Sequence, residues 1–173
     1  MNLVASNDPI LKQVAEEFNF ETPQQDPEGM FIAMRDVMCA NKGIGLAAPQ
    51  VGLPYRMFVI GNPDDRESCV AVFNPLILSN IGDEEVMYEE GCLTFPGLFI
   101  AVRRPRAIRV RYTNEKGVTD TVQFEGLTAR VFLHEYDHLD GILYTQRANR
   151  YHVEKAKKDL KLLHRQRKRV ARR

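Results

Sequence analysis

Cysteine is scarce in this chain, since only Cys39, Cys69 and Cys92 occur among its 173 residues. An odd and small number of cysteines at this length argues against a disulfide framework. Long apolar runs are absent as well, because no stretch approaches the roughly 20 residues that cross a bilayer, and no signal segment opens the chain. These absences argue against a disulfide-stapled or membrane protein and lead us to expect a cytoplasmic one without a membrane partner.

A strong net charge is also missing, because the 24 Lys and Arg nearly balance the 23 Asp and Glu and leave a formal net charge of +1. The chain as a whole therefore shows no preference for DNA. Its charge is uneven, since Asp159 is the only acid between Lys155 and Arg173 and the preceding body is net acidic. This segment predicts a basic amphipathic helix over residues 154–173. Its apolar stripe consists of Val153, Ala156, Leu160, Leu163 and Val170.

The length, with 44% hydrophobic and 27% charged residues, is typical of one globular domain. We expect a domain over residues 1–153, with the basic helix as its extension. Three more helices are predicted: a short N-terminal one beginning at Pro9, one from Pro27 to near Gly43, and one from Gly126 to about Gly141. The apolar positions of the first are Ile10, Leu11, Val14, Ala15 and Phe18.

Short runs of β-branched and aromatic residues predict strands between these helices, at 55–60, 70–73, 108–112 and 119–124. Asn74-Pro75 is expected to end the second strand, and the loop 114–117 to close a hairpin between the last two. Helices and strands are segregated, without a strand-helix-strand repeat. This pattern favours an α+β fold.

The segment HEYDH at 134–138 carries the strongest chemical signal. His134 and His138 lie one helical turn apart, so both imidazoles can reach one metal ion, with Glu135 near its open position. A bound metal lowers the pKa of its water toward about 7, and a carboxylate then moves the proton to the leaving nitrogen. The motif also arises by chance on charged helices. Its interpretation as a metal site therefore requires a third ligand from another segment.

That ligand is offered by EGCLTFPG at 90–97. A thiolate at Cys92 completes a Cys-His-His site with one open position. A free cysteine is more often a small buried hydrophobe, and we assign this role to Cys39 and Cys69. Gly91 and Pro96 imply a shaped loop in which the backbone approaches a ligand closely. We therefore predict that Cys92 binds the metal.

The segment GIGLAAPQ at 43–50 combines small residues with one amide side chain. Its glycines suit a close-packed turn beside a ligand, and Gln50 can donate to a developing oxyanion. The alternative is a helix stop followed by a tight loop. This motif alone does not decide between them.

GIGLAAPQ, EGCLTFP and HEYDHLDG occur in this order, and through them nearly the whole chain resembles the peptide deformylase family. The resemblance implies antiparallel or mixed sheets packed around a central HExxH helix, with an N-terminal and a basic C-terminal helix. It implies that a metal-activated water removes the formyl group from the N-terminal methionine of nascent polypeptides, releasing formate.

The resemblance also implies roles for individual residues. The metal ligands are Cys92, His134 and His138. Glu135 is the general acid and base, and Gln50 with the backbone N–H of Leu93 stabilises the oxyanion. The substrate-binding residues are Gly43, Ile44, Gly45, Leu127 and Val131. Glu90 pairs with Arg104 to hold the cysteine loop, or the two form a plain surface ion pair. Two positions depart from the family pattern, with Thr94 in place of serine and Leu133 in place of glutamine.

The metal and the partners follow from the same resemblance. Family members typically use ferrous iron in the cell, and zinc, nickel or cobalt can occupy the same site. The substrate is the N-formylmethionyl nascent peptide, and the basic helix predicts salt-sensitive binding to the ribosome. We expect a monomer in the cytoplasm, or in an organelle matrix if the source is eukaryotic.

Two other functions remain open. An HExxH zinc endopeptidase requires a Glu or His as third ligand and a long cleft, and it has no use for Cys92 or Gln50. A ribosome-binding module with a vestigial site explains the basic tail, but it does not require the complete set of ligands and base.

Overall fold

The computed structural model describes residues 1–170, apart from the side chains of His164 and of residues 166–170. The expected place of Val170 in the apolar stripe and the last three residues of the predicted basic helix, 171–173, lie outside the described residues.

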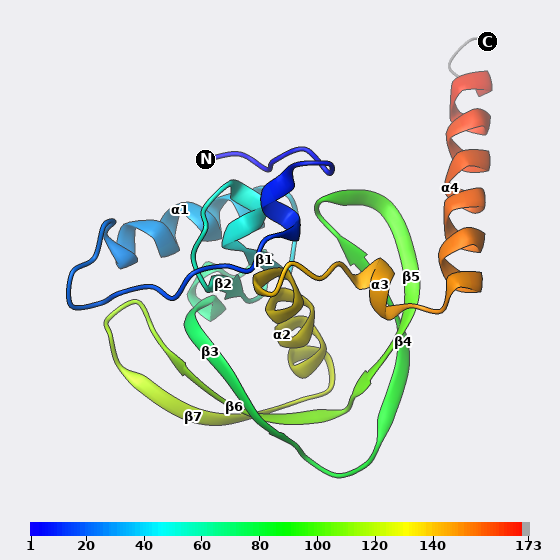
Figure 1. Cartoon of the computed structure of the whole chain (residues 1–173). Helices are drawn as coiled ribbons and strands as arrows, with labels where there is room; N and C mark the ends of the chain where they lie inside the picture. The colour runs from blue at the N-terminus through cyan, green and yellow to red at the C-terminus, as the bar shows by residue number, and fades with distance from the viewer. Residues whose placement is uncertain (171–173) are drawn as a thin grey trace.

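Two antiparallel sheets curve around one central helix (Figure 1). The larger sheet has the strand order β1-β2-β3-β6-β7, with bounds Gly45–Ala47, Met57–Ile60, Val70–Asn80, Ala107–Thr113 and Thr119–Glu125. The smaller sheet is the hairpin of β4 (Glu85–Cys92) and β5 (Phe95–Pro105). Helix α2 (Gly126–Leu139) contacts strands of both sheets. The predicted α+β fold is therefore confirmed.

The remaining helices lie outside this arrangement. Helix α1 (Pro27–Ala40) covers β1 and β2, and the short α3 (Tyr144–Arg147) leads into the long α4 (Arg150–Val170). Within residues 1–170 there are also three 3-10 turns, namely η1 (Pro9–Lys12), η2 (Ala48–Val51) and η3 (Arg66–Ser68). Asp26 caps α1 by accepting hydrogen bonds from the N–H groups of Glu28 and Gly29, as expected for a carboxylate before a proline at the first turn.

Three apolar clusters hold these elements together. Met30, Met34 and Met38 of α1 pack on one face of the larger sheet. Ala129, Phe132 and Leu139 of α2 pack on the same sheet in a second cluster, where the Phe132 ring meets Phe58 edge-on at 5.0 Å. The third cluster joins the β4–β5 hairpin to α3 and α4 through Leu98, Ile100, Val102, Tyr144 and Val153. Helix α2 is thereby fixed from its apolar side, and its Arg130, His134 and Asp137 contact the hairpin.

The predicted N-terminal helix is wrong beyond its first turn. Only Pro9–Lys12 forms a 3-10 turn, capped by Asp8, and the chain then runs extended with Val14 69% exposed. The reason is tertiary pairing, because the Ala15 N–H donates to the carbonyl of Leu139 and the Glu16 carbonyl accepts from Arg56 N–H. These bonds replace those of a helix, and tertiary context overrides local propensity.

Two strand predictions also need correction. Strand β3 does not end at Asn74-Pro75 but continues to Asn80, because a register irregularity between Phe73 and Leu76 absorbs the proline. Strands β4 and β5 were not predicted at all. Cys92, expected in a shaped loop, is instead the last residue of β4 and pairs with Phe95 across a tight turn.

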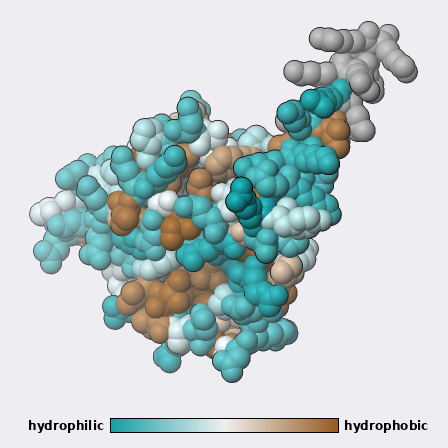
Figure 2. Space-filling model, turned by 45° about the vertical axis from the view of Figure 1, so that its right-hand side comes forward, coloured by the Kyte–Doolittle hydropathy of each residue, from teal (hydrophilic) through white to brown (hydrophobic). Residues whose placement is uncertain are grey.

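Helix α4 begins on the body and projects away from it (Figures 1 and 2). Val153, Ala156 and Leu160 pack against the hairpin cluster. Leu163 is 42% exposed, so the expected packing of the stripe ends at Leu160. None of the helices in residues 1–170 has the length and apolarity that crossing a bilayer requires.

Candidate metal centre

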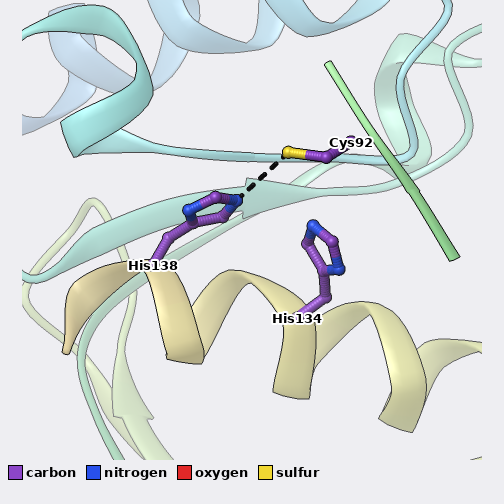
Figure 3. A group of neighbouring side chains, drawn as sticks. All are labelled: Cys92, His134 and His138. Atoms are coloured by element: carbon purple, nitrogen blue, oxygen red, sulfur yellow. Dashed lines mark hydrogen bonds between the residues drawn. The ribbon is translucent and has the colours of Figure 1, made fainter. Parts of the chain in front are cut away.

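The two histidines of HEYDH lie on the face of α2 that is turned toward Cys92 (Figure 3). Their rings are 5.2 Å apart, as expected for positions one turn apart on a helix. Both are buried, with exposed fractions of 7% for His134 and 1% for His138. The apolar residues on the opposite side of α2 force this orientation.

Cys92 approaches the histidines from the other element, the end of β4. Its Sγ atom lies 3.3 Å from Nε2 of His138 (Figure 3). One ligand atom from each of Cys92, His134 and His138 can be chosen so that all lie within 4.8 Å of one another. The structure therefore brings together the three residues that the sequence indicated as metal ligands.

The electrostatics of this cluster fit a divalent ion. Burial lowers the pKa of His138 well below its ordinary value, which leaves the ring neutral. Burial also lowers the pKa of His134, but hydrogen bonds to Cys92 and Glu90 outweigh it and raise that pKa to about 10 in the metal-free chain. The cluster thus attracts positive charge at the position where a metal would displace the proton. One sulfur and two imidazole nitrogens are a donor set suited to a divalent transition metal.

Glu135 lies beside the cluster, 4% exposed, between α2 and β1. Gly45 makes this approach possible, because a Cβ atom at that position would overlap Oε1 of Glu135. Among the described residues, its other oxygen, Oε2, has no hydrogen-bond partner. Burial raises the pKa of Glu135 to about 7, against the opposing charge of His134. A carboxyl group with this pKa can both accept and donate a proton near neutral pH.

The side chain of Gln50 is held by a backbone N–H at the start of η2. Its Oε1 accepts the N–H of Ala47 at 2.7 Å, which fixes the amide with its nitrogen toward the hairpin. There Nε2 donates to Oγ1 of Thr94 at 3.1 Å and lies 3.4 Å from Sγ of Cys92. The GIGLAAPQ segment is therefore more than a helix stop, because it presents an amide donor beside the cysteine. Thr94 retains the hydroxyl that this amide contacts.

Glu90 and Arg104 form a buried pair rather than a surface one, with side-chain exposures of 4% and 6%. Arg104 donates to both oxygens of Glu90, at 2.7 and 2.9 Å, and Glu90 Oε2 lies 3.0 Å from Nδ1 of His134. This carboxylate therefore fixes the ring so that its other nitrogen faces Cys92. Arg104 also donates to Asp137 of α2 at 2.9 Å.

Two arginines that α2 and α3 contribute to this network were not identified from the sequence. Arg130 of α2 donates to Glu90, and Arg147 of α3 donates to Asp137 at 2.7 Å. Arg130 stands four residues before His134, a helical spacing that placed it on the same face. Its hydrogen-bond partners are 28 to 44 residues away in sequence, however, and nothing local indicated them.

A cavity of about 640 Å³ opens over the cluster. The five residues expected to bind substrate all line it, together with Gln50, Leu93, Cys92, His134 and Glu135. Arg104 and His138 are buried and do not line the cavity. Tyr88 and Phe99 also line the cavity, and they were missed because β4 and β5 were not predicted. A signal was present in β5, because the buried residues Leu98, Ile100 and Val102 alternate with less buried ones as in a half-buried strand.

Comparisons with known proteins agree with this arrangement. The model of the family described as polypeptide deformylase matches residues 1–154. A peptide deformylase from Cytophaga hutchinsonii is 41% identical over 163 residues, covering 91% of this chain and 84% of the relative. One from Desulforudis audaxviator is 39% identical over 153 residues, covering 88% of this chain and 96% of the relative.

Solved structures show the same likeness. A crystal structure of peptide deformylase from Plasmodium falciparum superposes with a TM-score of 0.84 at 31% identity, covering 96% of each chain. The fold, the sequence and the residues gathered at the cavity all lead to one assignment. This chain belongs to the polypeptide deformylase family, whose members are metal-dependent hydrolases.

Proposed function

We propose that this protein hydrolyses the formamide bond of N-formylmethionine at the start of nascent polypeptides and releases formate. The observation that carries the proposal is that Gln50, Cys92, His134 and Glu135 line one cavity, where His138 completes a three-residue cluster with Cys92 and His134. Membership of the polypeptide deformylase family supports the same reaction.

Cys92, His134 and His138 would hold the metal ion. When bound, a divalent ion at this position lowers the pKa of a water molecule and polarises the formyl oxygen. We propose ferrous iron as the ion used in the cell, with zinc, nickel or cobalt able to replace it. The thiolate donor and the partly buried site support a soft transition metal over magnesium or calcium.

The chain's own residues position the substrate and move the proton. Glu135 accepts a proton from the attacking water at its carboxylate and delivers it to the departing amine, a task that its pKa of about 7 favours. Gln50 Nε2 and the backbone N–H of Leu93 stabilise the negative charge that develops on the formyl oxygen. The amide of Gln50 needs no reorientation, because Ala47 already holds its carbonyl end.

The methionine side chain would occupy the apolar part of the cavity. Ile44, Leu127 and Val131 line this part, and Ile44 and Leu127 are 43% and 61% exposed in the chain alone. Burying such surface under a thioether side chain contributes binding free energy. The backbone of Gly43 and Gly45 runs along the cavity and offers main-chain groups to the peptide.

The decisive test is formate release from formyl-Met-Ala-Ser by the metal-loaded protein. Glu135→Gln is expected to keep the metal and to lower kcat by a factor of about 10² to 10⁴, the usual range for a general acid and base. Wild-type protein with one equivalent of metal and no formate release would refute the proposal.

The variant Cys92→Ala distinguishes the proposed deformylase from the alternative endopeptidase. We expect this variant to lose the metal and the formate-releasing activity. Retained metal and cleavage of internal peptide bonds would favour the endopeptidase. The amide of Gln50 beside Cys92 supports the deformylase, because an endopeptidase site has no use for the sulfur.

We further propose that α4 binds the ribosome, as an extension of a monomeric domain over residues 1–153 that acts in the cytoplasm or an organelle matrix. The projection of this basic helix from the body supports the idea. Truncation would remove Val153 and Leu160 from the hairpin cluster, so charge removal is the sharper test. Replacing the exposed Lys157, Lys158 and Lys161 by Gln should weaken ribosome cosedimentation and reduce its salt dependence.

The matched control replaces three exposed arginines of the sheets, Arg103, Arg109 and Arg111, by Gln. It removes the same charge from strands β5 and β6 instead of α4. Equal ribosome affinity of both triple variants would refute a role for α4.

A further inference from the structure

Glu90 is the only carboxylate that the described residues place on His134, and two arginines hold it. Its Oε1 accepts from Arg104 at 2.7 Å and from Arg130 at 2.8 Å, and its Oε2 contacts Arg104 and His134. All four acceptor directions of the carboxylate are therefore in use. The orientation of the imidazole depends on how firmly this carboxylate is held.

The two arginines hold Glu90 from different elements. Arg104 belongs to β5, the partner strand of Glu90 in the same hairpin, and reaches α2 through Asp137 and the carbonyl of Leu133. Arg130 belongs to α2 and stands one turn before His134. Its bond to Glu90 therefore fixes the carboxylate relative to the helix that carries the imidazole.

Arg130 also fastens both strands of the hairpin to α2. Besides Glu90 it donates to the carbonyl of Val102 on β5 at 3.0 Å and to the carbonyl of Val86 on β4. Its guanidinium lies under the ring of Tyr88, with 5.8 Å to the ring centroid. With its side chain only 9% exposed, these charge-assisted bonds are sheltered from water. Cys92 is the last residue of β4 in the same hairpin.

We propose that Arg130 is a positioning residue for the metal centre, which keeps the Cys92 hairpin and the His134 imidazole in register through Glu90. This inference rests on the proposed function only in taking Cys92 and His134 as ligands. Arg130 contacts neither of them and acts through the carboxylate and the two strand carbonyls. Without it, Glu90 keeps Arg104 but loses its only arginine from α2, and the two carbonyls lose a donor.

The chain contains a matched control. Arg56 has a side chain 14% exposed, donates to Asp140 at 2.7 Å and to the carbonyl of Leu139 at 3.4 Å, and lies 5.4 Å from the ring centroid of Tyr136. It thus makes the same kinds of contact, with a carboxylate, a backbone carbonyl and a tyrosine ring, at the other end of α2. None of these partners contacts a ligand side chain in the described hydrogen bonds.

The experiment compares Arg130→Met, Arg130→Lys and Arg56→Met in the full chain. Each protein is loaded with Co²⁺, and release of the ion into excess chelator is followed by loss of the thiolate-to-metal absorption. Arg130→Met should release the ion about tenfold faster than wild type, at the lower end of what loss of a residue supporting a ligand costs. Arg130→Lys keeps the charge but not the fork of donors, and should fall in between. Arg56→Met should stay within about twofold of wild type.

A second readout needs neither metal nor activity. In crystal structures of the metal-free protein, the orientation of the His134 ring reports whether Nδ1 still faces Glu90. Wild type and Arg56→Met should show one orientation, with Nδ1 on Glu90, whereas Arg130→Met should show a mixture. Melting temperatures are expected to fall in both methionine variants, since both lose a largely buried ion pair.

Equal release rates in Arg130→Met and Arg56→Met, or an unchanged His134 ring in Arg130→Met, would overturn the proposal. If Arg130→Met does not fold, Arg130→Lys decides the question, and a wild-type release rate in that variant is equally contradictory. A wild-type protein that holds Co²⁺ but releases no formate would refute the proposed function and leave this inference standing.

Discussion

Replacing Gln50 by glutamate removes an amide donor while preserving the contact that holds the side chain at η2. Gln50 is 2% exposed, and its Oε1 accepts the N–H of Ala47 at 2.7 Å. A glutamate oxygen can accept the same bond, so the turn at η2 should keep its shape. The other oxygen takes the place of Nε2, which faces Thr94 at 3.1 Å and Cys92 at 3.4 Å. Thr94 can reverse its hydroxyl and donate.

The size of the effect follows from the role of the donor. Loss of one preorganised donor to a developing oxyanion costs about 3 kcal/mol, which corresponds to a 10²- to 10³-fold lower kcat. The added negative charge acts in the same direction. Because the amide acts mainly on the transition state, the KM for formyl-Met-Ala-Ser should change little.

The assay is formate release with formate dehydrogenase as coupling enzyme, on proteins whose metal content has been measured. Thr94→Val serves as the control, because it removes one partner of the Gln50 amide and keeps the donor. A neutral hydrogen bond of about 1 kcal/mol predicts a loss of about fivefold for this variant. A fully metallated Gln50→Glu that keeps kcat within fivefold of wild type would refute the reasoning, as would equal losses in both variants.

Two further predictions concern stability. Phe132→Ala removes a fully buried ring that meets Phe58 at 5.0 Å and should lower the free energy of unfolding by about 3–5 kcal/mol in urea, whereas a loss below 1 kcal/mol would contradict the packing described. Burial raises the pKa of Glu90, but hydrogen bonds with His134 and Arg104 prevail and lower it from 4.5 to about 2. Since the folded pKa lies below the unfolded one, the ionised carboxylate stabilises the metal-free fold above about pH 4.5, and this contribution is lost as the pH falls toward 2. Glu90→Gln should therefore show a weaker loss of stability over this pH window in urea unfolding, and an unchanged pH dependence would contradict the network.

The local parts of the site could be predicted from the sequence. The spacing of His134 and His138 places both rings on one side of any helix, whatever surrounds it, and the structure has them on α2. The capping signals at Asp26 and the hairpin loop at 114–117 are likewise local, and both elements formed as expected. Predictions of this kind hold because the determining interactions lie within a few residues.

The remaining features depend on distant partners. The segment after Pro9 has helical spacing, but backbone pairing with Leu139 and Arg56 gives it an extended conformation. Strand β4 is rich in acids, and its one buried carboxylate, Glu90, is stable only because Arg104 and Arg130 reach it from β5 and α2. Such a network has no signature in a window of neighbouring residues.

The central claim is that one sulfur and two imidazoles grip the same ion. X-ray absorption spectroscopy of anaerobically prepared, zinc-loaded protein tests it most directly. The account predicts one sulfur at about 2.3 Å and two imidazole nitrogens at about 2.0 Å, with the sulfur shell lost in Cys92→Ser. A wild-type spectrum with only nitrogen and oxygen neighbours would contradict it.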